Sequence, residues 1–422
     1  MKRLLVVLLF ALLIWMPFAV QSNCCPFCNA EGQTLTKEIN LAPLVIFGSI
    51  HKSTRVEDFS TEGTTEFIVE KVIKRHDILD KALQKRKDLD DKEVLTLARP
   101  IPIDKDKYKF VVFCDVFQGK IDPYRLLPVQ RESDPCKYLM GALEIKDKPQ
   151  PERLKFFFKY LDDPESDIAA DAYKEFAYAD YKDYQGMAKD LPADKIAGWI
   201  TDKNAQTFRL GLYASLLGHC GNAQHTGVLR KLLDDPTRRL TGGVDGIMAG
   251  YVMLDKKGGW DYLRNTLMDE KKDFTTRYAA LRAARFFHDF RSDLIEKKDA
   301  VEAISVLLDQ PDVADLAIED LRKWQVWDLA DRILALKDKE SHNIPIIKRS
   351  ILRYALECPK EAAKAFVDAR RKADPDAVQS SEELLKLEKM PPTPPAATPK
   401  ATPNANTNGK VEKKSSPLSG IR

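Results

Sequence analysis

The sequence predicts an α+β multidomain protein, in which a small closed β-barrel precedes an α–α solenoid of paired helices and a disordered tail. Three features predict this class. Strand-like segments fill residues 40–129, helical periodicity fills most of residues 151–377, and Pro, Thr, Ala and Asn dominate the last residues. We therefore divide the chain into a signal peptide at 1–22, a Cys-containing barrel at 23–145, a helical-repeat domain at 150–377 and a disordered tail at 387–422.

Composition limits the possible functions. Of the 422 residues, 44% are hydrophobic and 31% are charged, as in soluble proteins with a sizeable core. The 67 basic and 64 acidic residues leave a formal net charge of +3, and basic residues gather only in short runs. The sequence therefore predicts neither a nucleic-acid partner nor a cofactor.

The first residues have the pattern of an export signal. A lysine and an arginine precede an apolar run at residues 4–16, and Ser22 is a small residue suited to a cleavage site. We expect cleavage after Ser22 and export to the periplasm or beyond the cell. An uncleaved N-terminal anchor is one alternative. A lipoprotein signal modified at Cys24 is another, which Asn23 disfavours because a small residue should precede that cysteine.

Strands are expected in the next hundred residues. Segments 44–47, 67–73, 94–97 and 108–114 are rich in β-branched and aromatic residues and are separated by charged or turn residues. The charged insert at 77–92 is expected to hold a short helix or a long hairpin. Four or five strands suffice for a small closed barrel, which removes exposed sheet edges.

Seven cysteines suit the oxidising compartment that export implies. The disulfide candidates lie in the first third of the chain and are Cys24, Cys25, Cys28, Cys114 and Cys136. Cys220 and Cys358 fall in helical segments, and an odd total leaves at least one thiol free or paired between chains.

The cysteines near the mature N-terminus, with the strands at 67–73 and 108–114, resemble the netrin-like version of the OB-fold found in metalloproteinase inhibitors. The resemblance implies an OB-type barrel over about a quarter of the chain. In those inhibitors the mature chain begins with a cysteine whose amine binds the protease zinc. Asn23 precedes Cys24 here, so only the fold is carried over.

A recurring joint punctuates the helical region. In residues 160–164 an apolar residue, two aspartates and a proline follow one another, and similar runs stand at 232–236 and 307–311. With weaker joints at 200–202 and 268–269, the spacing is about 33–40 residues, the period of two-helix repeats. We therefore expect helix pairs that stack on their neighbours to bury their apolar faces.

The variable unit length and the prolines at the joints resemble HEAT-type repeats over about half of the chain. The whole arrangement, with Cys25-Pro-Phe-Cys28 near its start and helices after it, is also similar to uncharacterised secreted proteins of planctomycete-type bacteria. That second resemblance implies no activity.

The Cys25-Pro-Phe-Cys28 motif is the most specific chemical signal. A CxxC pair can exchange disulfides, as in thioredoxin-type sites, but that chemistry needs a strand before the motif and a helix after it. The motif instead follows the export signal directly. Structural disulfides to the barrel are the favoured interpretation, with redox chemistry, or zinc held together with Cys114 and Cys136, as alternatives.

Other candidate sites have simpler structural explanations. His219, Cys220 and His225 have a spacing that a metal could use, although the segment is typical of a helix end. The glycines at 242–246 and 258–259 lack a phosphate-binding pattern and favour close helix packing.

Carboxylates cluster at the joints, where they suit helix starts better than an acid–base pair. They are Asp162, Asp163, Asp171, Glu175, Asp234, Asp235 and Asp309. Four tryptophans could line a groove, but their helical setting favours core packing. They are Trp199, Trp260, Trp324 and Trp327.

No catalytic constellation emerges, so we assign no catalytic residue. The sequence predicts an exported, non-enzymatic scaffold that binds an unknown protein partner through the surface of its helical repeats. The alternative is a thiol–disulfide protein of the cell envelope that uses Cys25 and Cys28.

Overall fold

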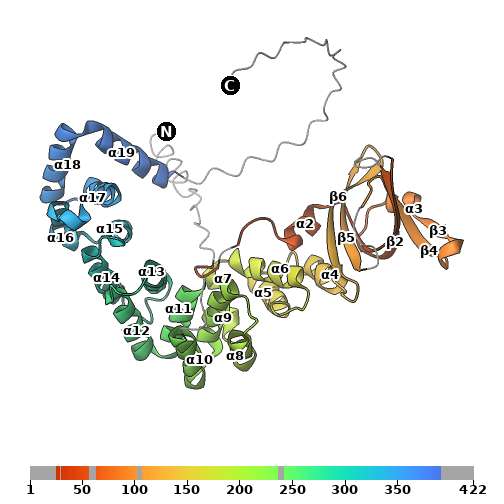
Figure 1. Ribbon diagram of the computed structural model, residues 1–422, viewed down its shortest axis with the longest axis horizontal. Helices are drawn as coiled ribbons and strands as arrows, with labels where there is room; N and C mark the ends of the chain where they lie inside the picture. The colour runs from red at the N-terminus through yellow and green to blue at the C-terminus, as the bar shows by residue number, and fades with distance from the viewer. Residues whose placement is uncertain (1–24, 29, 57–62, 102–106, 236–241, 391–422) are drawn as a thin grey trace, which may run out of the picture.

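The computed structural model describes residues 25–28, 30–56, 63–101, 107–235 and 242–390. The predicted signal peptide, Cys24 and most of the predicted tail lie outside these residues. A β-sheet stands at one end of the molecule, and the helices follow one another along a curve from it (Figure 1).

The strands form one six-stranded antiparallel sheet in the order β3-β4-β2-β1-β5-β6. Their bounds are β1 Leu44–Arg55, β2 Gly63–Lys74, β3 Gln84–Arg86, β4 Lys92–Leu97, β5 Tyr108–Phe117 and β6 Lys120–Gln130. The sheet is open, so the predicted closed barrel is wrong. One edge strand, β3, has only three residues, and the other, β6, contains Pro123 and Pro128. Proline lacks the N–H that a further strand would need, which suits an edge position.

Both faces of the sheet are apolar, and they belong to different cores. Leu44, Ile46 and Phe110 point to a small core within the curled sheet, which the short helix α3 (Leu79–Ala82) helps to cover. Val45 and Phe113 point to the opposite face and join the core of the helices. This alternation is the two-residue period of a strand. The sheet and the helices therefore share a continuous core. The α3 helix and the β3 strand lie in the insert at 77–92, as predicted.

Helices occupy the rest of the described chain. Two flank the sheet, α2 (Leu35–Leu41) and α4 (Cys136–Glu144). The remainder, which we call the helical array, comprises α5 Gln150–Phe158, α6 Ser166–Ala177, α7 Tyr181–Ala188, α8 Ala193–Thr201, α9 Thr207–Cys220, α10 Ala223–Asp234, α11 Val244–Leu254, α12 Lys256–Met268, α13 Phe274–Phe290, α14 Lys297–Ser305, α15 Ala314–Lys323, α16 Ala330–Ala335, α17 Pro345–Glu357, α18 Glu361–Ala373 and α19 Pro375–Lys389. The helices thus continue past residue 377, where the prediction ended them.

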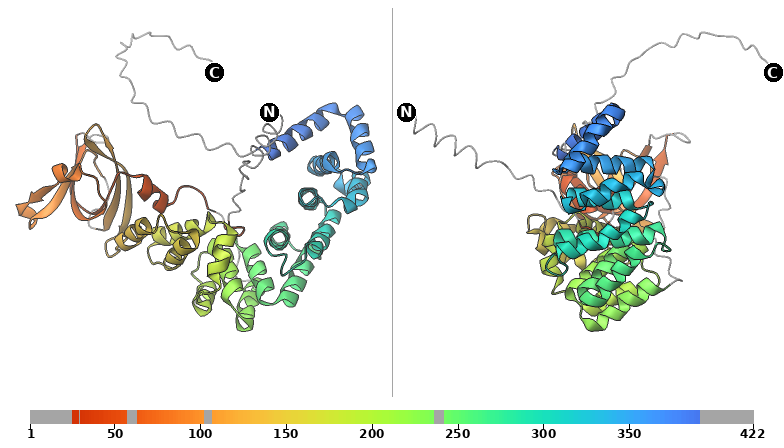
Figure 2. Two further views of the ribbon diagram at one scale, coloured as in Figure 1. Left: turned by 180° about the vertical axis from the view of Figure 1, so that it is seen from behind. Right: turned by 90° about the vertical axis from the view of Figure 1, so that its left-hand side faces the viewer.

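The array has two layers along its curve. Helices α13, α15 and α17 lie on the inner side of the curve, and α12, α14, α16 and α18 lie on the outer side (Figures 1 and 2). Along the inner layer α9 packs on α11 and α11 on α13, while α15 packs on α17 and α17 on α19. No helix among the described residues is both long and apolar enough to cross a bilayer.

The predicted joints coincide with the ends of outer helices. The outer helices α8, α10 and α12 end at Thr201, Asp234 and Met268, and the 3₁₀ turn after α14 ends at Asp309. Joint aspartates have structural partners within the array, some of them on other helices. Asp162 accepts hydrogen bonds from Trp199 Nε1 at 2.9 Å and from Lys195 Nζ at 3.2 Å.

Several polar contacts between successive inner helices and the turns beside them share one sequence separation. Arg285 Nε donates to Asp320 Oδ2 at 2.7 Å, and Trp324 Nε1 donates to Asp289 Oδ1 at 3.1 Å, each across 35 residues. The same separation joins further pairs, Arg277 with Asp312, Arg322 with Glu357 and Arg353 with Glu388. This period lies within the 33–40 residues expected from the joints, so neighbouring helix pairs make equivalent contacts.

Candidate functional site

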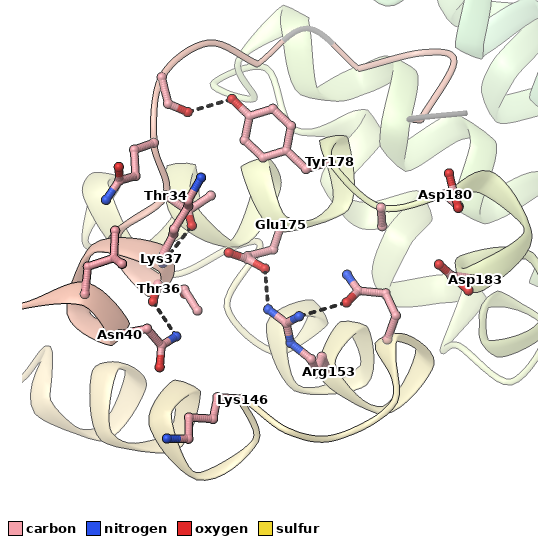
Figure 3. Close-up of a pocket in the computed structure, with 15 residues that line it drawn as sticks. Thr34, Thr36, Lys37, Asn40, Lys146, Arg153, Glu175, Tyr178, Asp180 and Asp183 are labelled. Carbon is pink, nitrogen blue, oxygen red and sulfur yellow. Dashed lines mark hydrogen bonds and ion pairs between the residues drawn. The ribbon is translucent and has the colours of Figure 1, made fainter. Parts of the chain in front are cut away.

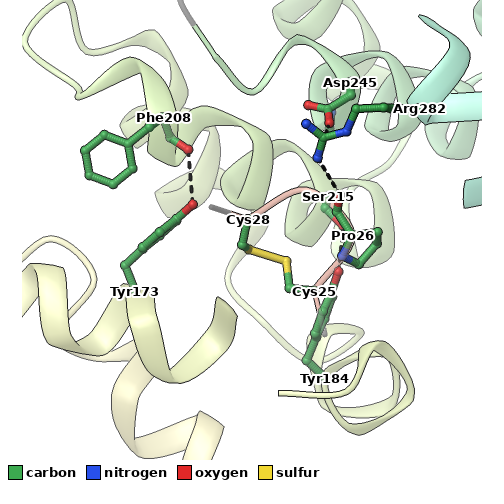
Figure 4. Close-up of a disulfide and its surroundings, with 10 residues drawn as sticks. Cys25, Pro26, Cys28, Tyr173, Tyr184, Phe208, Ser215, Asp245 and Arg282 are labelled. Atoms are coloured by element: carbon green, nitrogen blue, oxygen red, sulfur yellow. Dashed lines mark hydrogen bonds and ion pairs between the residues drawn. A yellow bond between two sulfur atoms is a disulfide. The ribbon is translucent and has the colours of Figure 1, made fainter. Parts of the chain in front are cut away.

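The described residues between Cys25 and Thr34 form what we call the N-terminal strap, which lies across the inner layer of the helical array (Figure 4). Array residues hold its backbone. Cys25 N–H donates to Ala177 O at 3.3 Å, and Arg282 Nη2 donates to Pro26 O at 2.9 Å. Tyr178 hydroxyl donates to Gly32 O at 2.6 Å. Cys25 to Cys28 form a turn, in which Cys28 N–H donates to Cys25 O at 3.3 Å. The array therefore binds a turn of its own chain and the residues after it through hydrogen bonds to their backbone.

Phe27 is the apolar anchor of the strap. Its side chain is 3% exposed, and its ring centroid lies 4.6 Å from that of Phe286 in an edge-on arrangement. The strap reaches this depth because small residues line its path. A Cβ on Gly211 would lie 3.1 Å from Phe27 O and 2.9 Å from the Gly243 Cα.

The two cysteines of the motif are bonded to each other, with Cα atoms 5.5 Å apart. Bridges from the motif to the sheet, the favoured sequence interpretation, are not formed. The strap is fixed on the helical array, whereas Cys114 and Cys136 are buried as free thiols in β5 and at the start of α4. Burial raises the pKa of both thiols to about 12, so they stay protonated at neutral pH.

The surroundings of Cys25 and Cys28 differ from those of an activated dithiol. Cys25 is 4% exposed and Cys28 is half-buried. The next helix in the sequence begins only at Leu35, so the motif does not open a helix as the dithiol of a thioredoxin-type site does. Access to the disulfide is therefore through Cys28.

Asp171 of α6 holds the start of α2. Its carboxylate accepts hydrogen bonds from Leu35 N–H at 2.5 Å, Thr36 hydroxyl at 2.9 Å and Tyr138 hydroxyl at 2.7 Å. Burial raises the pKa of Asp171, while these donors act to lower it. The carboxylate thus supplies acceptors that the first turn of α2 needs, from 136 residues away. Sequence inspection placed Asp171 among the joint carboxylates and missed Thr36 and Tyr138.

A polar cleft of about 850 Å³ lies where the strap and α2 meet α4–α5 and α6–α7 (Figure 3). We call it the junction cleft. At its centre Arg153 Nη2 donates to Glu175 Oε2 at 3.1 Å, and Arg153 Nη1 donates to Gln150 Oε1 at 2.9 Å. Burial raises the pKa of Glu175, opposed by Thr34 and Arg153. The volume of the junction cleft is in the range of small-ligand sites.

Charges of opposite sign occupy different sides of the junction cleft. Lys37 and Lys146 lie on the side of α2 and α4, and Asp180 and Asp183 lie on the side of α7 (Figure 3). Asp180 precedes α7, yet its side chain does not cap that helix, and Oδ1 is buried without a hydrogen-bond partner. Sequence inspection singled out none of these four residues, because nothing local marks them.

The candidate metal ligands take separate partners. His219 Nε2 lies 3.0 Å from Tyr181 hydroxyl, and burial lowers the pKa of His219 to about 4. His225 Nε2 lies 3.1 Å from Asp194, and Cys220 Sγ donates to Leu216 O. Within the described residues no group of three or more His, Cys, Asp or Glu side chains is placed to hold a metal ion.

The four tryptophans serve packing and the joints. Trp260 is 9% exposed, and Trp324 stacks on His288 with centroids 3.7 Å apart. Trp199 and Trp327 pack against Tyr213 and Tyr354.

Comparisons with known proteins add little. No family model matches the chain, and no curated protein does. A structure of human deoxyhypusine hydroxylase in complex with glycerol aligns with 60% of this chain and 90% of that chain, at 14% identity and a TM-score of 0.24. A similarity this weak carries no argument about fold or function.

Proposed function

We propose that this protein is an exported, non-enzymatic scaffold whose helical array, of HEAT type, binds a segment of a partner protein on its inner side. One observation carries the proposal. The inner layer already holds the N-terminal strap by hydrogen bonds to its backbone and by the buried Phe27 ring. Peptides bound in protein grooves use the same combination of main-chain hydrogen bonds and side-chain anchors.

An exposed aromatic pair on α13, the helix that also holds the strap, supports the proposal. Phe274 and Tyr278 of α13 are stacked with centroids 5.7 Å apart, and Phe274 is 47% exposed. Phe274 lies about two helical turns before Arg282, the residue that holds Pro26, and Tyr278 lies about one turn before it. Aromatic and arginine side chains are enriched at the energetic centres of protein interfaces.

Site-specific photocross-linking in the full chain tests this function. A benzophenone amino acid replaces Phe274 on the inner layer, or Gly227 on the outer helix α10, where an added Cβ meets nothing within 4 Å. In cells that naturally make the protein, we expect one dominant cross-linked partner from position 274 and none from position 227. Equal labelling from both positions, or no adduct from position 274, would contradict the proposal.

Export is part of the same proposal and rests on residues 1–22, outside the described residues. Intact-mass measurement of the protein from the envelope and from the culture medium checks it. A mature chain that begins at Asn23 supports cleavage after Ser22. A full-length chain in the membrane fraction would favour the uncleaved anchor.

A thiol–disulfide function of Cys25 and Cys28 is the second candidate, favoured by their direct bond and by the partial exposure of Cys28. In exchange, a thiolate of an external dithiol attacks Cys28 Sγ and breaks the Cys25–Cys28 bond, and its second thiol then releases the reduced protein. The test measures the rate at which a dithiol reduces insulin in the presence of wild type or of Cys28→Ser. Equal rates would exclude this function.

A further inference from the structure

We propose that the junction cleft is a binding site for a small zwitterion that carries a free ammonium group and a free carboxylate, such as an amino acid or a short peptide. The ammonium group contacts Asp180 and Asp183, and the carboxylate contacts Lys37 and Lys146. This ligand site lies on the junction of the sheet and the array, and it is independent of the partner proposed for the inner layer.

The acidic side of the cleft lacks a donor. Asp180 Oδ1 is buried and accepts no hydrogen bond, although Asp180 stands directly before α7. A buried carboxylate oxygen without a donor is costly, and such groups in native structures call for an explanation. Asp183 lies one turn further along α7 and also lines the cleft. An ammonium group has three donors and can serve both carboxylates.

The basic side of the cleft lacks an acceptor. Lys37 and Lys146 are exposed and line the cleft, and neither Nζ has an ion-pair partner among the described residues. Burial lowers the pKa of a third lysine, Lys74, and repulsion by the nearby positive charge of Lys146 lowers it as well. A ligand carboxylate would relieve this excess of positive charge.

The centre of the cleft separates the two sides. Arg153 and Glu175 neutralise one another there, with side chains 24% and 9% exposed. The lysines and aspartates therefore face a common cavity but form no salt bridges with each other. One ligand with both charges satisfies both sides at once, whereas a simple cation or anion leaves one side unpaired.

Isothermal titration calorimetry with the full mature chain tests the proposal. The ligands are alanine and its di- to pentapeptides, because their only charges are the two termini. We expect at least one length to bind with a Kd below about 1 mM. N-acetylation or C-amidation of that ligand should weaken its binding at least tenfold.

Charge-removing variants assign each end of the ligand. Asp183→Asn should weaken the free peptide about tenfold without changing the affinity of its N-acetylated form. Lys146→Gln should weaken the free peptide without changing the affinity of its C-amide. Lys155→Gln removes an exposed lysine of α5 outside the cleft and should change nothing. Circular dichroism confirms that each variant is folded, and Lys37→Gln replaces Lys146→Gln if the latter is not.

The proposal is overturned if no free peptide binds below about 1 mM, or if capped and free peptides bind equally. It is also overturned if Lys155→Gln weakens binding as much as Lys146→Gln. Cross-linking of a partner from position 274 can succeed or fail regardless of these results, so the two proposals are tested separately.

Discussion

At the scale of single residues, His219 links stability to pH. Burial lowers its pKa to about 4 in the folded chain, against an ordinary value near 6.5. Between these values the unfolded state binds the proton and the folded state does not. The stabilisation is therefore complete above about pH 6.5 and is lost as the pH falls toward 4. We expect wild type to lose about 2 kcal/mol more than His219→Gln between pH 7 and pH 4.5, measured by urea unfolding.

Asp320 serves as the internal contrast for that experiment. Burial raises its pKa to about 6, although Arg285 acts to lower it. Here the folded state holds the proton between about pH 4 and pH 6, so the associated stability is lost as the pH rises. Asp320→Asn should steepen the loss of stability in acid, opposite to His219→Gln. If the slope of unfolding free energy against pH changes in the same direction in both variants, these assignments are contradicted.

Glycine positions in the array make a second prediction at this scale. A Cβ on Gly246 would lie 2.3 Å from the Gly211 carbonyl oxygen, so α9 and α11 pack backbone to backbone. Gly246→Ala must push these helices apart and should cost about 3 kcal/mol of unfolding free energy. Gly227→Ala, in the middle of α10 with nothing within 4 Å, should instead stabilise the protein by about 1 kcal/mol. Thermal unfolding of both variants provides the comparison.

At the scale of elements, α2 depends on a carboxylate from another helix. Asp171→Asn keeps the size of the side chain but turns one acceptor oxygen into a donor, which then faces either the Leu35 N–H or the Thr36 N–H. We expect a loss of about 2 kcal/mol and, by hydrogen exchange, faster opening of α2 than of α11. Asp167→Asn, one turn earlier on the same helix and exposed, should cost about 0.5 kcal/mol or less. Uniformly faster exchange in α2 and α11 would show that α2 is not a separate unit.

The elements differ in how far the sequence could predict them. The joints at 160–164, 232–236 and 307–311 were predictable because an acidic residue and a proline mark a helix end within five residues. The open sheet was missed, although Pro123 and Pro128 are local signals of an edge strand. The strap and the junction cleft could not be predicted, because their contacts are distant in sequence. Pro26 meets Arg282 across 256 residues, and no local pattern encodes such a contact.

At the scale of the whole molecule, the polar contacts between residues 35 apart connect each inner helix with the next, so they stabilise the array along its length. Each pair of helices buries its apolar face only against the neighbouring pairs. The loss of one contact therefore destabilises the adjacent helices first and the rest of the array through them. The last of these contacts reach α19. Arg322 of α15 pairs with three carboxylates, those of Glu319 on α15, Glu357 on α17 and Glu388 on α19. The Arg322 side chain is only 4% exposed.

Removal of this arginine should therefore loosen the end of the array. Arg322→Met fills a similar volume but leaves partly buried carboxylates without their cation, which should cost about 3 kcal/mol. Burial acts to raise the pKa of Glu357, but Lys389 and Arg322 lower it by more than burial raises it. The pKa of Glu357 therefore lies below its ordinary value. The stability difference between Arg322→Met and wild type should consequently shrink in acid, because protonation of the carboxylates removes their uncompensated charge. Arg371→Met, which breaks an exposed pair with Glu382, should cost less than about 0.5 kcal/mol at any pH. Urea unfolding at pH 7 and pH 4, with hydrogen exchange in α19, measures both, and equal costs for the two variants would contradict a closing role for Arg322.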